Sequence, residues 1–135
     1  MEKLTKDRKD LLHQIASDYV EEGLNKGNLD NLPYHPQVEF RAPLLPGGSS
    51  VPIKGREHIL EKIGKVLESV ESSELVDTYV NKDLTAATVE FYCNFREPKT
   101  KLRIIDRFRI NGAGQITEQE NFYDPRDISH PGWKN

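Results

Sequence analysis

Apolar residues recur at three- and four-residue steps in two segments of the chain, which predicts two amphipathic helices. The first covers residues 5–26, and the Gly27 that follows it is typical of the residue that ends a helix. The second covers residues 56–70. Its apolar stripe consists of Ile59, Leu60, Ile63, Val66, Leu67 and Val70.

Much of the remaining chain alternates between apolar and polar residues, as strands buried on one side do. Strands are predicted over residues 37–42, 74–81, 85–96, 100–110 and 115–123. Residues 28–32 form one further turn. Residues 44–55, rich in Pro, Gly and Ser, form a loop that we expect to be a lid or rim, and residues 124–135 form an irregular tail. This order predicts an α+β fold in which short connections make the last four strands antiparallel neighbours.

Alternation within the two longest strands predicts their buried faces. Over residues 85–96 the core face carries Val89, Phe91, Cys93 and Phe95. Over residues 100–110 an acid, Asp106, falls in the middle of the row that also holds Leu102, Ile104, Phe108 and Ile110. A buried carboxyl group is costly unless it is protonated, paired or hydrogen-bonded. Asp106 is therefore either a functional carboxyl in a pocket or a structural one paired with a neighbouring group.

The last strand offers two opposite faces, and burying Glu118 and Glu120 together is unfavourable. We therefore expect Gln119, Asn121 and Tyr123 to point inward, with Ile116, Glu118, Glu120 and Phe122 outward. This assignment predicts an apolar cavity with one polar wall, a common composition for a small-molecule site. The alternative is that these polar side chains satisfy one another and that the cavity is closed.

Composition limits the remaining function classes. A length of 135 residues fits one domain over residues 1–135. The single cysteine, Cys93, excludes an internal disulfide and favours a cytoplasmic location. A net charge of −3 with dispersed Lys and Arg argues against nucleic-acid binding, and no apolar run is long enough for a membrane span. No cluster of ligands indicates a metal, and no motif indicates a cofactor.

Several motifs together resemble one family. Residues 105–116, with the sequence IDRFRINGAGQI, closely resemble a strand–turn–strand of the bacterial ketosteroid isomerases and are similar to SnoaL-like members of the NTF2-like superfamily. Residues 24–30, 38–43, 55–59 and 122–127 resemble, in family order, the end of the first helix, the first strand, the start of the third helix and the closing strand. The resemblance implies a cone-shaped fold in which a curved mixed or antiparallel sheet wraps around helices.

The resemblance also implies roles for individual residues. The isomerases use a carboxylate base together with an oxyanion hole made by a tyrosine and a protonated aspartic acid. Asp106 matches that aspartic acid. An ungapped match through Gly27 places Val20 on the tyrosine, so that Tyr19 lies one residue away, about 100° around the helix.

The base of the isomerases has no counterpart in this sequence. Its position falls on Ala42, or on Phe40 on the same face, and neither side chain can accept a proton. In the related epoxide hydrolases a carboxylate of the last strand activates water, and the matching residue here is Asn121. Steroid isomerase activity is therefore not predicted.

The sequence thus favours a protein that binds a small, cyclic, hydrophobic molecule. One alternative is an isomerase, lyase or hydrolase in which Asp106 is the acid or oxyanion donor and Tyr19 assists it. Another is a dimeric interaction domain, and a homodimer through the convex face of the sheet is expected in any case. The predicted ligand-binding residues are Phe40, Ile63, Val89, Phe91, Phe108, Gln119, Asn121 and Tyr123.

Overall fold

The computed structural model describes residues 2–96 and 99–129 of the chain. Its helices are α1 (Glu2–Asp18), α2 (Arg56–Leu67) and the short α3 (Arg126–Ser129). A π-helical turn, Tyr19–Leu24, continues α1, and two short 3-10 turns cover Leu29–Asn31 and Gly48–Ser50. The strands are β1 (Tyr34–Arg41), β2 (Ile53–Lys54), β3 (Val70–Val80), β4 (Ala86–Arg96), β5 (Lys99–Ile110) and β6 (Ile116–Phe122).

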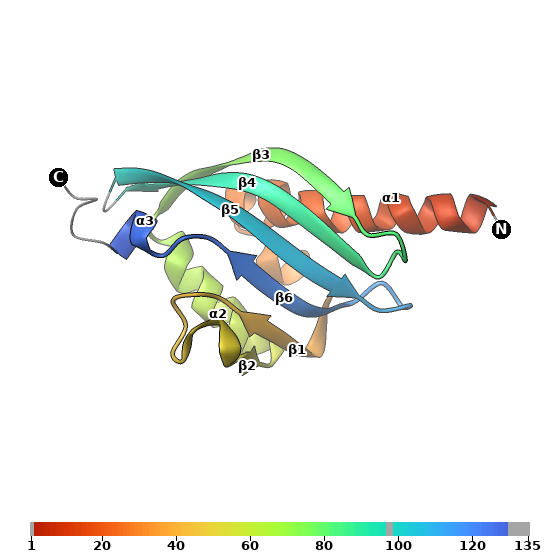
Figure 1. The fold of residues 1–135 in the computed structure, drawn as a ribbon, viewed down its shortest axis with the longest axis horizontal. Coiled ribbons are helices and arrows are strands. Elements are labelled where there is room, and N and C mark those ends of the chain that lie inside the picture. Colours follow the sequence, from red (N-terminus) through yellow and green to blue (C-terminus); the bar gives the residue numbers. More distant parts are fainter. Residues whose placement is uncertain (1, 97–98, 130–135) are drawn as a thin grey trace.

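These strands form one six-stranded mixed sheet in the order β2-β1-β6-β5-β4-β3. The β1–β6 pair is parallel and all the other neighbours are antiparallel. The sheet curves over the helices, with α1 packed against β3 and β4 and α2 packed against β1 (Figure 1). The structure is thus the α+β fold that the sequence predicts.

The first predicted helix matches its sequence pattern well. Leu12, Ile15 and Ala16 of α1 are buried, and the helical segment extends to residue 26. Gly27 follows with a φ of +71°, a left-handed conformation that side chains with a Cβ disfavour. The π-helical turn is the feature that the pattern did not predict, because it inserts one residue into the helix without interrupting it.

Element boundaries differ from the prediction where strands begin. The second helix ends at Leu67 because Val70 already starts β3, four residues before the predicted strand. β1 starts at Tyr34 although Pro36 lies within it. The pairing of β1 with β6 shifts between Tyr34 and Glu39, and Pro36 lies at this irregularity. A proline, which has no backbone N–H to donate, is tolerated in a strand at such a position.

Two segments predicted to be irregular contain regular structure. The loop of residues 44–55 contains the short strand β2, which pairs with β1. The tail of residues 124–135 contains α3, and its residues 130–135 lie outside the described part of the chain.

The sheet faces follow the predicted alternation in β4 and β5, but not at the start of β6. All the inward positions named for these two strands are buried, Asp106 among them. Ile116 was expected to point outward with Phe122, and this expectation is wrong, because Ile116 is fully buried. The cause is a register shift in which Arg109 pairs with Glu118 and Ile110 with Ile116, which reverses the alternation at Thr117.

Candidate functional site

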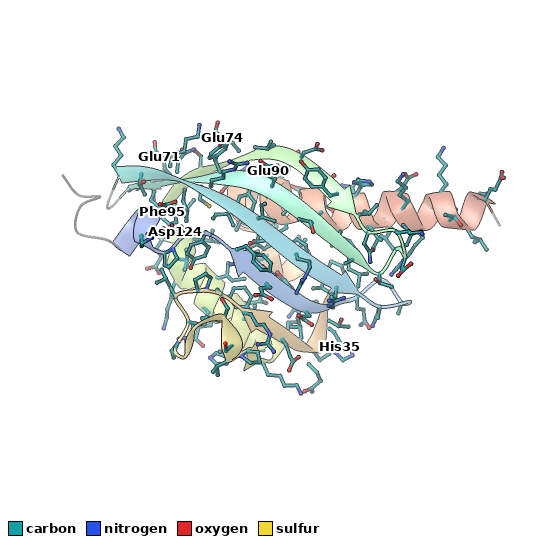
Figure 2. The ribbon with its side chains drawn as sticks, viewed as in Figure 1. His35, Glu71, Glu74, Glu90, Phe95 and Asp124 are labelled. Carbon is teal, nitrogen blue, oxygen red and sulfur yellow. The ribbon has the colours of Figure 1, made fainter. Side chains whose placement is uncertain are left out.

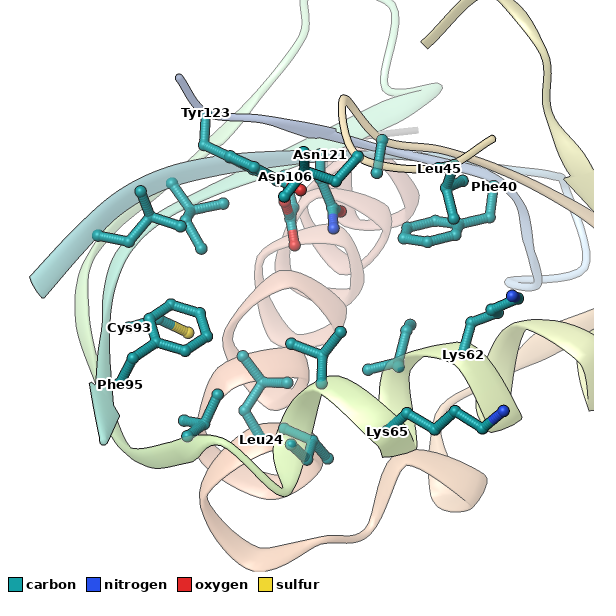
Figure 3. Close-up of a pocket in the computed structure, with 18 of the residues that line it drawn as sticks. Leu24, Phe40, Leu45, Lys62, Lys65, Cys93, Phe95, Asp106, Asn121 and Tyr123 are labelled. Carbon is teal, nitrogen blue, oxygen red and sulfur yellow. The ribbon is translucent and has the colours of Figure 1, made fainter. Parts of the chain in front are cut away.

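A cavity of about 340 Å³ lies between the concave face of the sheet and α2 (Figure 3). Its walls come from the π-helical turn, β1, the loop after β1, α2 and the inward faces of β3 to β6. Most lining side chains are apolar: Leu24, Phe40, Ala42, Leu44, Leu45, Pro46, Ile63, Val66, Leu67, Val70, Phe91, Phe95, Leu102 and Ile104. Leu44, Leu45 and Pro46 make the predicted loop part of the wall.

Asp106 supplies the carboxyl group of this cavity. It lies on β5, is only 1% exposed and pairs directly with Asn121 of β6. With its nitrogen turned toward the carboxyl group, the Asn121 amide donates to Oδ1 at 2.8 Å and to Oδ2 at 3.1 Å. Both residues line the cavity. Figure 3 shows them together on the sheet side of the cavity.

Tyr19 reaches Asp106 from the helical side. Its ring packs against Phe108 at 5.1 Å and Phe91 at 6.1 Å between centroids. Its hydroxyl group lies near the Asp106 carboxyl group and lowers the pKa of that group. Tyr19 is the first residue of the π-helical turn, which inserts one residue between Tyr19 and Gly27, the size of the offset that the resemblance leaves at Tyr19.

A second buried tyrosine, Tyr34, lies in the same polar region as Tyr19 and Asp106. The Tyr34 hydroxyl group donates to Gln119 Oε1 at 2.5 Å, and both residues are buried. The Gln119 amide lies near the Tyr19 hydroxyl group and lowers its pKa. Tyr34, Gln119, Tyr19 and Asp106 thus form one buried cluster of polar groups.

Burial controls the charge of Asp106. It raises the pKa of the carboxyl group well above its usual range because the charged form is poorly solvated, and the nearby Tyr19 hydroxyl group opposes this only in part. The pKa of the Tyr19 hydroxyl group is also raised, by burial first and by Asp106 second. The site therefore favours a neutral acid and a neutral phenol, two hydrogen-bond donors that can hold a carbonyl or hydroxyl oxygen.

Within the described part of the chain, no histidine and no second carboxyl group lines the cavity to act as a base beside this acid. Phe40 and Ala42, at the base position that the resemblance implies, both line the cavity. Asn121 is at the position where the resemblance implies a carboxylate for the epoxide hydrolases, and its amide is not a base. Among the described residues that line the cavity, Asp106 is the one carboxyl group.

The cavity brings together seven of the ten predicted site residues. Those that line it are Tyr19, Phe40, Ile63, Phe91, Asp106, Asn121 and Tyr123. Val89, Phe108 and Gln119 are fully buried and are not part of the lining. Of these, Phe108 and Gln119 contact Tyr19, so they lie one layer behind the cavity.

Other features of the site were not predicted. Tyr34 precedes the strand predicted to begin at residue 37, and only a strand beginning at residue 34 would have brought it to the inner face. Lys62 and Lys65 of α2 also line the cavity, and the spacing of the apolar stripe could have indicated this, since both flank Ile63 and Val66. Cys93, predicted to be a core residue, also lines the cavity.

The described residues show neither a metal site nor a membrane span. Over residues 2–96 and 99–129, no group of three His, Cys, Asp or Glu side chains could hold a metal ion. None of the helices in the same ranges is long and apolar enough to cross a membrane.

Comparison with known proteins gives structural matches only. No protein-family model and no curated protein matches the sequence. A steroid delta-isomerase from Pseudomonas aeruginosa has a TM-score of 0.70 and 21% identity, covering 87% of this chain and 82% of that one. The epoxide hydrolase/cyclase-like enzyme SalBIII, from pyran ring formation in salinomycin, has a TM-score of 0.68 and 15% identity, covering 91% and 95%.

An NTF2-like protein from Anabaena variabilis is similar to the same degree, with a TM-score of 0.69 and 19% identity over 85% of this chain and 87% of that one. At these identities the similarity establishes the fold, while function depends on the site. The chain therefore has the α+β fold of the NTF2-like superfamily, to which the SnoaL-like proteins belong.

Proposed function

We propose that the protein binds a small, cyclic, mainly apolar molecule in the cavity between the sheet and α2. The volume of about 340 Å³ is roughly twice that of an engineered cavity of about 150 Å³ that binds benzene, which suits a molecule of two or three fused rings. Apolar side chains dominate the lining, so burial of the rings provides most of the binding free energy.

The observation that carries this proposal is a nearly inaccessible acid that nevertheless lines the cavity. Asp106 and Asn121 form a polar spot on an otherwise apolar wall, and Tyr19 stands beside them. A ligand carbonyl or hydroxyl oxygen at this spot accepts a hydrogen bond from the neutral carboxyl group. The polar spot thus orients the ligand, and the apolar wall binds it.

Thermal unfolding in the presence of 2-naphthol or naphthalene tests this proposal. 2-Naphthol should raise the melting temperature of the wild type more than naphthalene does, because ligands that bind only the folded state stabilise it. Asp106→Ala should remove this difference, with each shift measured from the variant's own melting temperature. The matched control is Asp83→Ala, since Asp83 is exposed. The absence of any shift in the wild type with either compound would contradict the proposal.

A second function, acid catalysis, is favoured by the same pair of donors. Asp106 and Tyr19 are arranged to stabilise negative charge that develops on a substrate oxygen, as an isomerase, lyase or hydrolase of this fold requires. Binders found in the thermal assay are then tested for turnover. Catalysis predicts that Asp106→Asn abolishes turnover while binding persists. Binders that remain unchanged over long incubation with the wild type support the binding function alone.

The convex face supports the proposal of a homodimer. Ile105 and Phe122 are paired across β5 and β6 and are 38% and 42% exposed. The Arg107 guanidinium group lies 5.5 Å from the Phe122 ring and 3.2 Å from Glu120. Figure 2 shows Glu74 and Glu90 on β3 and β4, and they form ion pairs with Lys101 and Arg103 of β5.

The exposed face thus has an apolar pair, Ile105 and Phe122, with basic and acidic side chains around it. Across a two-fold axis the basic side chains of one copy can face the acidic side chains of the other, so a second copy of this chain is the partner that fits. Sedimentation equilibrium should give a dimer for the wild type and a monomer for Ile105→Glu. Val76→Glu is the control, because Val76 is an exposed apolar residue elsewhere in the sheet, on β3. A wild type that is monomeric at all concentrations would exclude the homodimer.

A further inference from the structure

Two lysines of α2 line the same cavity as Asp106 and Asn121. Figure 3 shows Lys62 and Lys65 on α2, across the cavity from the Asp106–Asn121 pair, with apolar side chains between them. Within the described part of the chain Lys62 has no ion-pair partner. The cavity therefore has a neutral donor pair on its sheet side and two lysine side chains on its α2 side, and in Figure 3 the nitrogen ends of these lysines point away from the donor pair.

Resting on the proposed binding function, we infer that the ligand is an amphipathic acid whose anionic group is bound by Lys62 and Lys65. Its rings lie in the apolar part of the cavity, and its uncharged oxygen lies at Asp106. Hydroxylated or oxo-substituted cyclic carboxylic acids are the chemical class that fits both ends.

Electrostatics within α2 supports the inference. Lys62 and Lys65 are three residues apart on one helix face, where like charges repel. Lys65 lies 3.5 Å from Glu61, but both side chains are 67% exposed, so water screens this pair. An anion bound between the two lysines relieves their repulsion, and the apolar lining beside it strengthens the attraction.

The position of Asp106 determines which end of the ligand carries the charge. An anion beside Asp106 would lie next to a buried acid and would disfavour its ionised form still further. The lysines offer the opposite charge at the solvent-accessible side of the cavity. The two ends thus specify one orientation of an amphipathic acid.

A matched pair of ligands tests this inference: 6-hydroxy-2-naphthoic acid and its methyl ester, which differ in the negative charge. Fluorescence titration near neutral pH should show that the wild type binds the acid about 3- to 10-fold more tightly than the ester. The double variant Lys62→Gln/Lys65→Gln should lose this preference while still binding the ester. Added salt should weaken acid binding alone. The control is Lys9→Gln, an exposed lysine of α1, which should retain the preference.

The outcomes separate the two proposals. Equal affinity of the wild type for acid and ester would overturn the inference of an anionic ligand and leave the binding function standing. A preference for the acid that survives in the double variant would also overturn it, because the charge would then be bound elsewhere. Failure of both compounds to bind would contradict the binding function itself.

Discussion

One terminal atom of the Asn121 amide lies 2.8 Å from Oδ1 and 3.1 Å from Oδ2 of Asp106. The amide can present its nitrogen to an ionised carboxylate or its oxygen to a protonated carboxyl group, since an amide has both a donor and an acceptor end. The direct pairing of these residues across β5 and β6 holds this contact in place. Asp106 therefore has a hydrogen-bond partner in either protonation state, which explains how a buried acid is tolerated in the cavity wall.

The first prediction concerns the pH dependence of stability. The pKa of Asp106 is raised in the folded state, so between about pH 4 and that pKa the folded protein retains a proton that the unfolded chain releases. The free energy of unfolding contributed by Asp106 is therefore fully present below about pH 4 and is lost as the pH rises through the folded pKa. Asp106→Asn should remove this loss, which approaches about 1.4 kcal/mol per pH unit.

Urea denaturation of wild type and Asp106→Asn from pH 4 to pH 8 measures this effect. The difference between the two curves isolates Asp106, because the other titrating groups are common to both proteins. Asp83→Asn, at an exposed turn position, should run parallel to the wild type. Parallel curves for Asp106→Asn as well would mean that the buried carboxyl group titrates as it does in the unfolded chain.

A second prediction concerns the buried hydrogen bond from Tyr34 to Gln119. Tyr34→Phe leaves Gln119 Oε1 buried without this donor, which should lower the free energy of unfolding by about 1–3 kcal/mol. The double variant Tyr34→Phe/Gln119→Leu should lose less stability than the sum of the losses of the two single variants. The reason is that Gln119→Leu removes the acceptor that Tyr34→Phe leaves without a donor. Tyr79→Phe is the control, since its exposed hydroxyl group donates to Glu90 and its removal should change stability little. Fully additive losses would show that the bond contributes nothing of its own.

Much of the site follows from strand alternation. It placed Asp106 in the buried row of β5, and it placed Asn121 and Tyr123 inward because burying Glu118 and Glu120 together is unfavourable. In the structure these two glutamates form ion pairs with Arg107 and Arg109. The alternation of inward and outward side chains predicts the buried face correctly where a strand pairs regularly with both of its neighbours. It failed at Ile116, where a register shift reverses the faces within one residue.

The missed parts of the site depend on contacts between distant segments. The π-helical turn brings Tyr19 to Asp106, and a helical pattern does not show such an insertion. Tyr34 is an inner-face residue only because β1 pairs in parallel with β6, 82 residues further on at Ile116. No local periodicity encodes these relationships.

A third prediction concerns Arg8, which joins α1 to two turns of the sheet. Its guanidinium group donates to the backbone oxygens of Leu84 at 3.1 Å, Ile110 at 2.9 Å and Asn111 at 2.9 Å. Arg8→Ala should lower the free energy of unfolding by about 1–3 kcal/mol and speed amide exchange in the turn after β5, because three partly buried carbonyl groups lose a charged donor. The exposed neighbour Lys9→Ala is the control. If both variants unfold at the same urea concentration, Arg8 does not hold the helix on the sheet.

A fourth prediction uses Cys93, the single cysteine of the sequence, as a probe of the cavity. Burial raises the pKa of its thiol to about 11, so near pH 8 its thiolate fraction is about two orders of magnitude below that of a free cysteine. A disulfide reagent such as 4,4′-dithiodipyridine should therefore react slowly, with a rate that still rises at pH 9 to 10. Saturating 2-naphthol should slow it further by occupying the same space, whereas the rate for free cysteine should not change. Slowing by 2-naphthol would place the ligand beside Cys93, and an unchanged rate despite measurable binding would place it outside the cavity.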